Sequence, residues 1–139
     1  MGRVITKALI RNFADVVRAD DGSIGPDEIR QVEVEALVDT GATSLVLPKD
    51  IVDRLGLKQL RTMTVVYADE RRETLPVAGV AVVRIGNRET ECDCIVAKAG
   101  AQSLIGQIVL EGLDLSVDCK EGVLKPRPDS VDLPLMELR

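Results

Sequence analysis

One aspartate lies in a local sequence that is suited to hydrolytic chemistry. The apolar stretch Ala36-Leu37-Val38 leads directly into Asp39-Thr40-Gly41, and small or hydroxyl residues follow at Ala42, Thr43 and Ser44. Two aspartates about 3 Å apart can share one proton, so that one carboxylate acts as base and the other as acid on a single water. Glycine lets two such loops approach closely, and threonine can supply a hydroxyl that ties them together. The stretch therefore predicts half of a two-aspartate site.

The motif occurs only once. The sequence contains one Asp-Thr-Gly and no Asp-Ser-Gly. A single carboxylate cannot share a proton with itself, so the second Asp39 has to come from a second subunit. The sequence therefore predicts that the active form is a homodimer with two-fold symmetry.

Two motifs together resemble a known family. Asp39-Thr40-Gly41-Ala42 resembles the signature of the retropepsin-like aspartic proteases, and Leu104-Ile105-Gly106 resembles the hydrophobic-hydrophobic-glycine element that packs behind the catalytic loop in that family. The resemblance covers residues 32–125 and is closest to small microbial stand-alone relatives. It implies an aspartic endopeptidase in which Asp39 is catalytic and Thr40, Gly41 and Ala42 support the catalytic loop.

The same resemblance implies further roles. The segment from Tyr67 to Thr74 falls where relatives carry the flap, a hairpin that closes over the substrate. We expect the peptide substrate to contact Thr43, Tyr67, Ala68 and Asp69. Relatives interleave terminal strands at the dimer interface, which points to residues 3–9 and the tail 126–139, chiefly its apolar positions 131–138. The resemblance implies no cofactor and no metal.

The elements that position these residues are expected to be mostly strands. Apolar and alternating patterns predict strands at 3–12, 31–38, 63–67, 74–85, 89–97, 113–118 and 122–125. Short helices are predicted from Pro48 to Leu55 and over one turn from Ile108 to Leu110, the latter ended by Gly112. Residues 19–27 are rich in turn formers and predict a loop, longer than the family pattern leads us to expect. The fold class is therefore all-β, a closed barrel or sandwich with one or two short helices, in a single domain over residues 1–139.

The composition excludes several kinds of function. The chain has no histidine, which rules out Ser-His-Asp and Cys-His catalysis. A net charge of -5 and two aromatic residues argue against binding to nucleic acid. No apolar run is long enough for a membrane span. Three cysteines without a signal peptide fit a reducing, cytoplasmic location, and Cys92, Cys94 and Cys119 are interpreted as structural residues and not as metal ligands.

Two other functions fit parts of the pattern. A retropepsin-like dimer could bind peptides or assemble with partners while being weakly active or inactive, because a fold does not establish a function. The run of hydroxyl residues after Asp39 and Gly41 also resembles the phosphate-binding hairpin of actin-like kinases. That fold needs two large α/β domains, for which 139 residues are too few.

Overall fold

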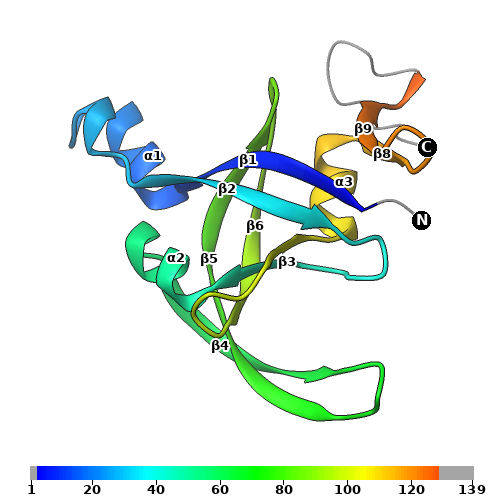
Figure 1. The fold of residues 1–139 in the computed structure, drawn as a ribbon. Coiled ribbons are helices and arrows are strands. Elements are labelled where there is room, and N and C mark those ends of the chain that lie inside the picture. Colours follow the sequence, from blue (N-terminus) through cyan, green and yellow to red (C-terminus); the bar gives the residue numbers. More distant parts are fainter. Residues whose placement is uncertain (1–2, 129–139) are drawn as a thin grey trace, which may run out of the picture.

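The computed structural model describes residues 3–128 of the chain (Figure 1). The strands of this part are β1 (Val4–Asn12), β2 (Gln31–Val38), β3 (Leu45–Pro48), β4 (Lys58–Val66), β5 (Arg72–Ile85), β6 (Arg88–Ala97), β7 (Ser103–Ile105), β8 (Leu115–Asp118) and β9 (Val123–Pro126). The helices are α1 (Phe13–Asp20), the 3-10 turn η1 (Pro26–Glu28), α2 (Lys49–Leu55) and α3 (Gln107–Leu113). The predicted tail strand at 131–138 lies outside the described residues.

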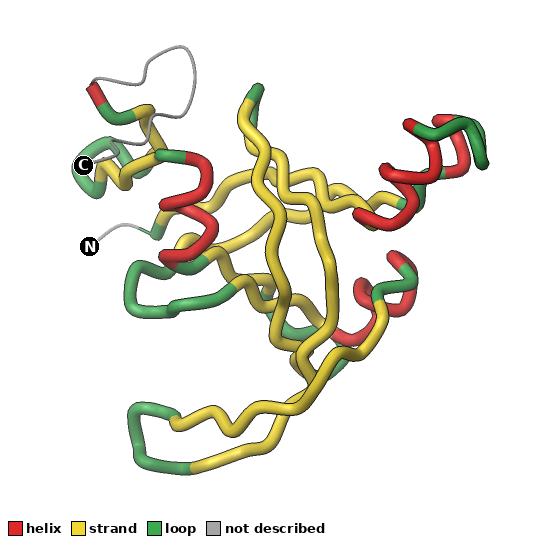
Figure 2. Tube along the Cα trace, turned by 180° about the vertical axis from the view of Figure 1, so that it is seen from behind, coloured by secondary structure: helices red, strands yellow, loops and turns green. Residues whose placement is uncertain are grey.

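The main sheet closes into a barrel. Its strand order is β1-β2-β7-β3-β6-β5-β4, and β1 also pairs with β5, which joins the two sides of the sheet. Strand β4 lies outside this ring and pairs only with β5, forming a long hairpin that extends beyond the barrel (Figures 1 and 2). Strands β8 and β9 form a separate small hairpin. The all-β closed barrel with a few short helices is confirmed.

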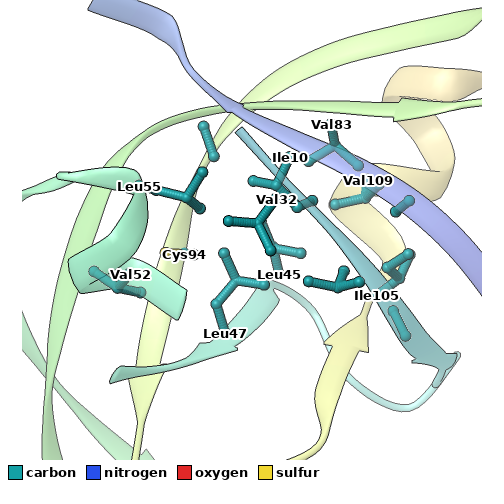
Figure 3. Close-up of a cluster of buried hydrophobic side chains, with 14 of the residues drawn as sticks. Ile10, Val32, Leu45, Leu47, Val52, Leu55, Val83, Cys94, Ile105 and Val109 are labelled. Atoms are coloured by element: carbon teal, nitrogen blue, oxygen red, sulfur yellow. The ribbon is translucent and has the colours of Figure 1, made fainter. Parts of the chain in front are cut away.

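Aliphatic side chains fill the barrel. The close-up in Figure 3 shows side chains from strands β1, β2, β3, β5, β6 and β7 meeting those of α2 and α3. The largest fully buried ones include Ile10, Leu45, Leu47, Leu55 and Ile105. Full burial of one such side chain contributes about 1.5–3 kcal/mol. With only two aromatic residues in the chain, this aliphatic cluster supplies most of the hydrophobic stabilisation.

Helix α1 was not predicted, and part of it overlaps the expected loop. The Asn12 side chain caps the helix by accepting a hydrogen bond from the Asp15 N–H at 3.1 Å. The helix runs on to Asp20, and the 3-10 turn over Pro26–Glu28 orders more of the segment that was predicted to be a loop. The signal was the cap. Phe13, Val16 and Val17 do have helical spacing, but the segment is short and the adjacent β-branched Val16 and Val17 do not favour a helix.

Several other boundaries differ from expectation, among them the start of β4 at Lys58 and the short strand β7, which was not predicted. Pro48 is the last residue of strand β3, which was not predicted, and it precedes the first helical residue of α2. Helix α3 continues through Gly112 to Leu113 and is capped by Asp114, whose φ of 55° is left-handed. Gly112 lies against the Thr90 side chain of β6, where a Cβ would collide. Its role is therefore close packing of α3 on β6, and the helix stop belongs to Asp114.

No helix within residues 3–128 is both long enough and apolar enough to cross a membrane.

Candidate active site

Asp39 stands directly after the last residue of β2, in a tight turn that fixes its carboxylate. Its backbone N–H donates to the Ile105 carbonyl at 3.0 Å, and its own carbonyl accepts from the Ala42 N–H at 3.1 Å. Its Oδ1 accepts from the Gly41 N–H at 2.9 Å. Asp39 is half-buried, whereas Thr40 and Gly41 are exposed. The loop therefore orients the carboxylate and leaves one face of the turn accessible.

Strand β7 and the start of α3 brace this loop from behind. Val38 is in parallel register with Ile105, and the N–H groups of Gln107 and Ile108 donate to the carbonyls of Ala42 at 3.0 Å and Thr43 at 2.9 Å. A Cβ on Gly106 would lie 2.6–2.7 Å from backbone atoms of residues 42–44, a separation that real side chains do not show. Only glycine therefore fits here, and the Leu-Ile-Gly element does pack against the loop.

A side chain that sequence reasoning missed also holds the loop. The Gln107 side chain donates through Nε2 to the Thr40 carbonyl at 3.2 Å. The residue directly follows the Leu-Ile-Gly element, and that position was its only signal in the sequence.

Leu104 and Ile105 point to opposite faces of the sheet. Ile105 is fully buried in the core, whereas Leu104 is half-buried on the other face. The strand registers align Leu104 with neighbours in a row that we call the apolar row: Ile5, Leu37, Leu104, Val46 and Ile95. Leu104 was expected to be structural and behind the site, but the register places it on the open face beside the catalytic loop. Leu37, Val46 and Ile95 were not singled out from the sequence.

The segment predicted to be the flap forms the turn of the β4–β5 hairpin. Tyr67 N–H donates to the Arg71 carbonyl at 2.8 Å, and the turn between them contains the exposed Ala68 and Asp69 and the left-handed Glu70. The turn curves toward the same end of the molecule as the β2–β3 loop that carries Asp39 (Figures 1 and 2).

Tyr67 is held at the end of the hairpin by two neighbours. Its hydroxyl donates to Glu73 Oε1 at 2.6 Å, and the Arg71 guanidinium lies 4.2 Å from the ring centroid. The hydrogen bond to Glu73 raises the pKa of Tyr67 above its ordinary value. The phenol therefore stays protonated and keeps its donor at neutral pH.

A cavity of about 450 Å³ lies between the hairpin and the β6–β7 loop. Tyr67 lines it, whereas the other expected substrate contacts, Thr43, Ala68 and Asp69, do not. Thr43 is exposed in the catalytic loop. Within one chain, the expected substrate residues thus fall into a catalytic-loop group and a hairpin group that face a common end of the barrel.

Two of the three cysteines, Cys92 and Cys94, are placed as structural residues, whereas Cys119 is exposed, contrary to the expectation for that residue. Cys94 is buried and pairs in register with Leu45 and Ala78, and burial raises the pKa of Cys92 to about 11 and that of Cys94 to about 12. Both thiols are therefore protonated and unreactive at neutral pH. Within residues 3–128, no group of three or more His, Cys, Asp or Glu side chains is arranged to hold a metal ion.

Comparisons with known proteins agree with this geometry. The family model described as gag-polyprotein putative aspartyl protease matches residues 26–112, a span that contains both Asp39 and Gly106. Protein DNA-DAMAGE INDUCIBLE 1 of Arabidopsis thaliana is 28% identical over 114 residues, covering 79% of this chain. The chain spans only 28% of that relative's length.

A solved structure is also similar. The crystal structure of a retropepsin-like aspartic protease from Rickettsia conorii has 21% sequence identity and a TM-score of 0.44, over 84% of this chain and 88% of that chain. The family match, which covers more than half of the sequence and includes the braced Asp39 turn, identifies the chain as a member of the retropepsin-like aspartic protease family.

Proposed function

We propose that this protein is an aspartic endopeptidase that acts as a homodimer, with one Asp39 from each subunit. The observation that carries the proposal is the braced Asp39 turn, in which the Gly41 N–H holds one carboxylate oxygen at 2.9 Å and leaves the group half-exposed. A carboxylate whose orientation is set before substrate binds is what a water-activating site requires.

The mechanism follows from two such carboxylates at a two-fold axis. Like charges this close cannot both ionise, so the pair retains one proton. The ionised Asp39 takes a proton from water as the water attacks the peptide carbonyl. The protonated Asp39 polarises that carbonyl and then protonates the departing amine.

The surroundings of the catalytic loop support a subunit contact there. Ile5 on β1 and Ile108 at the start of α3 are both 48% exposed. Ile108 is bonded directly to the loop through its N–H and the Thr43 carbonyl, and Ile5 lies in the apolar row two strands from Leu104. Exposed apolar side chains beside a half-site are the kind of surface that association buries. The exposed Thr40 is free to meet its counterpart across the axis.

The test is cleavage of a peptide library by the wild type and by Asp39→Asn, read by mass spectrometry. We expect at least a thousandfold loss of activity in Asp39→Asn, since the dyad is the only proton-transfer device proposed. Asp20→Asn, an exposed aspartate in α1, is the matched control and should keep full activity. Full activity in a correctly folded Asp39→Asn protein would refute the proposal, and binding without cleavage by the wild type would favour a non-catalytic peptide-binding module.

A further inference from the structure

The cavity beneath the hairpin has an unusual charge for an acidic protein. The charged side chains that line it are the cations Lys49, Arg71 and Lys98 and the single carboxylate of Glu73. The chain as a whole carries a net charge of -5. The cavity is therefore a local positive site in a negative molecule, and the electric field in such a site attracts anionic groups.

The partners of these side chains leave the positive charge available. Glu73 already accepts the Tyr67 hydroxyl, and Arg71 lies over the Tyr67 ring with its closest carboxylate oxygen, on Asp69, at 4.0 Å. Lys98 makes no ion pair with any other residue in the described part of the chain.

Lys49 is the one cation of the cavity with a close partner. Its Nζ lies 2.7 Å from Asp53 Oδ2, but both side chains are more than 60% exposed. A pair this exposed is weak, so it can be shared with a second carboxylate at little cost.

The loop that carries Lys98 is fixed in place. Lys98 follows the last residue of β6, and its carbonyl accepts the Ala101 N–H at 3.1 Å to form a turn. The Gly100 N–H donates to Asp50 Oδ1 at 3.0 Å, which ties this turn to helix α2. The cation is thus presented from a braced turn, opposite the Arg71 side of the hairpin.

The cavity borders the face on which the apolar row lies, and it is also lined by Val96, which belongs to the opposite, core-facing side of β6. Glu73, Leu75 and Val77 alternate along one face of β5, and Val77 is in register with Ile95 of the apolar row. A peptide lying on that face would therefore place side chains over the apolar row and into the cavity. The cavity is also lined by the apolar side chains of Leu75, Pro76 and Val96, which can pack against the methylene groups of a glutamate.

We infer that this cavity is a specificity subsite for an acidic side chain, glutamate or aspartate, of the peptide substrate, with Lys98 as its main cation. The inference rests on the proposed peptide cleavage and deepens it by naming a substrate class. Lys98 would position the substrate without taking part in the chemistry, because it lies outside the turn that carries Asp39.

The experiment uses the full-length protein and one cleavable peptide, varied to Glu, Gln or Lys at each of the four positions on either side of the scissile bond. At one or more positions we expect kcat/KM for Glu to exceed that for Gln by about three- to tenfold, a modest factor because exposed ion pairs are weak. Lys98→Glu should bring this ratio to 1 or below, and Lys98→Ala should lower it. Lys120→Glu is the control, because it makes the same charge change at an exposed lysine of the β8–β9 turn and should leave the ratio unchanged.

The outcomes separate the subsite from the catalysis. Cleavage with a Glu to Gln ratio near 1 at every position, or a ratio that Lys98→Glu does not alter, would overturn the subsite and leave the endopeptidase standing. If no peptide is cut, the same peptides are titrated onto Asp39→Asn by fluorescence anisotropy. The subsite is supported without catalysis if Asp39→Asn binds Glu peptides more tightly than Gln peptides and the double variant Asp39→Asn, Lys98→Glu does not. Equal binding of Glu and Gln peptides by Asp39→Asn overturns the subsite.

Discussion

At the scale of single residues, the Asp39 turn depends on a glycine that is remote from it in sequence. Gly106 lies against the backbone of residues 42–44, with no room for a methyl group between them. The backbone of the turn cannot move away freely, because it is bonded to Gln107 and Ile108 on one side and to Ile105 on the other. The position of Asp39 is therefore coupled to the packing at Gly106.

We expect Gly106→Ala to destabilise the protein by about 2–3 kcal/mol, since overpacking against fixed backbone commonly costs this much. Gly100→Ala is the comparison. That site is open, and its cost of about 1 kcal/mol comes only from a left-handed φ of 81°. Urea unfolding of both variants gives the free energies. Equal values would show that the contact at Gly106 is easily relieved.

At the scale of elements, helix α1 is attached to the start of β2 by a buried carboxylate. Asp15 accepts Arg30 Nε at 2.8 Å and Nη2 at 3.0 Å, and it also accepts the Arg30 backbone N–H at 3.0 Å. The Asp15 side chain is almost fully buried, whereas that of Arg30 is about half exposed. The hydrogen bond from the Arg30 side chain is the main cause that lowers the pKa of Asp15.

We expect Asp15→Asn to lower the free energy of unfolding by about 2 kcal/mol at neutral pH, between the values for exposed and for buried pairs, because Arg30 is solvated. The folded-state pKa of Asp15 is below its unfolded value, so this stabilisation is fully present above the ordinary aspartate pKa. It is lost as the pH falls through the lowered folded pKa. Chemical denaturation from pH 7 down to about pH 2 should show a constant difference between wild type and variant above the ordinary aspartate pKa and a shrinking difference below it. Asp20→Asn, in the same helix, should track the wild type throughout.

At the scale of the whole molecule, the proposed site is complete only when two chains meet. The exposed Ile5 pairs with Leu37, two residues before Asp39, and the exposed Ile108 is hydrogen-bonded to Thr43. The hairpin curves toward the end of the molecule that carries the β2–β3 loop (Figure 1). If only the dimer is active, the specific activity depends on protein concentration through the monomer–dimer equilibrium.

We expect excess Asp39→Asn protein to inhibit the wild-type protein by forming mixed dimers with it. With random exchange of subunits, the activity per wild-type chain should fall in proportion to the wild-type fraction, because every mixed dimer lacks one carboxylate. Titrating Asp39→Asn into a fixed amount of wild type in a peptide-cleavage assay measures this, and an Asp20→Asn titration is the control. Activity that does not respond to Asp39→Asn would indicate that one chain suffices.

The local motifs could be read from the sequence because their chemistry is local. An apolar strand ending in Asp39-Thr40-Gly41, and a Leu-Ile-Gly downstream, need particular residue types for backbone reasons that hold in any context. The alternation in β2 likewise predicted which of its residues are buried. These features were enough to predict the barrel class and the family.

The remaining features depend on pairings between distant segments. The separation of Leu104 from Ile105, the assembly of the apolar row and the placement of Lys98 and Arg71 around one cavity all follow from strand register and hairpin curvature, which no short stretch encodes. Helix α1 is held by the cap at Asn12 and the long-range pair between Asp15 and Arg30. The sequence by itself thus determined the proposed catalytic residue, Asp39, and its loop. Only the tertiary structure decided which side chains surround that loop, because contacts between distant segments form only once the barrel closes.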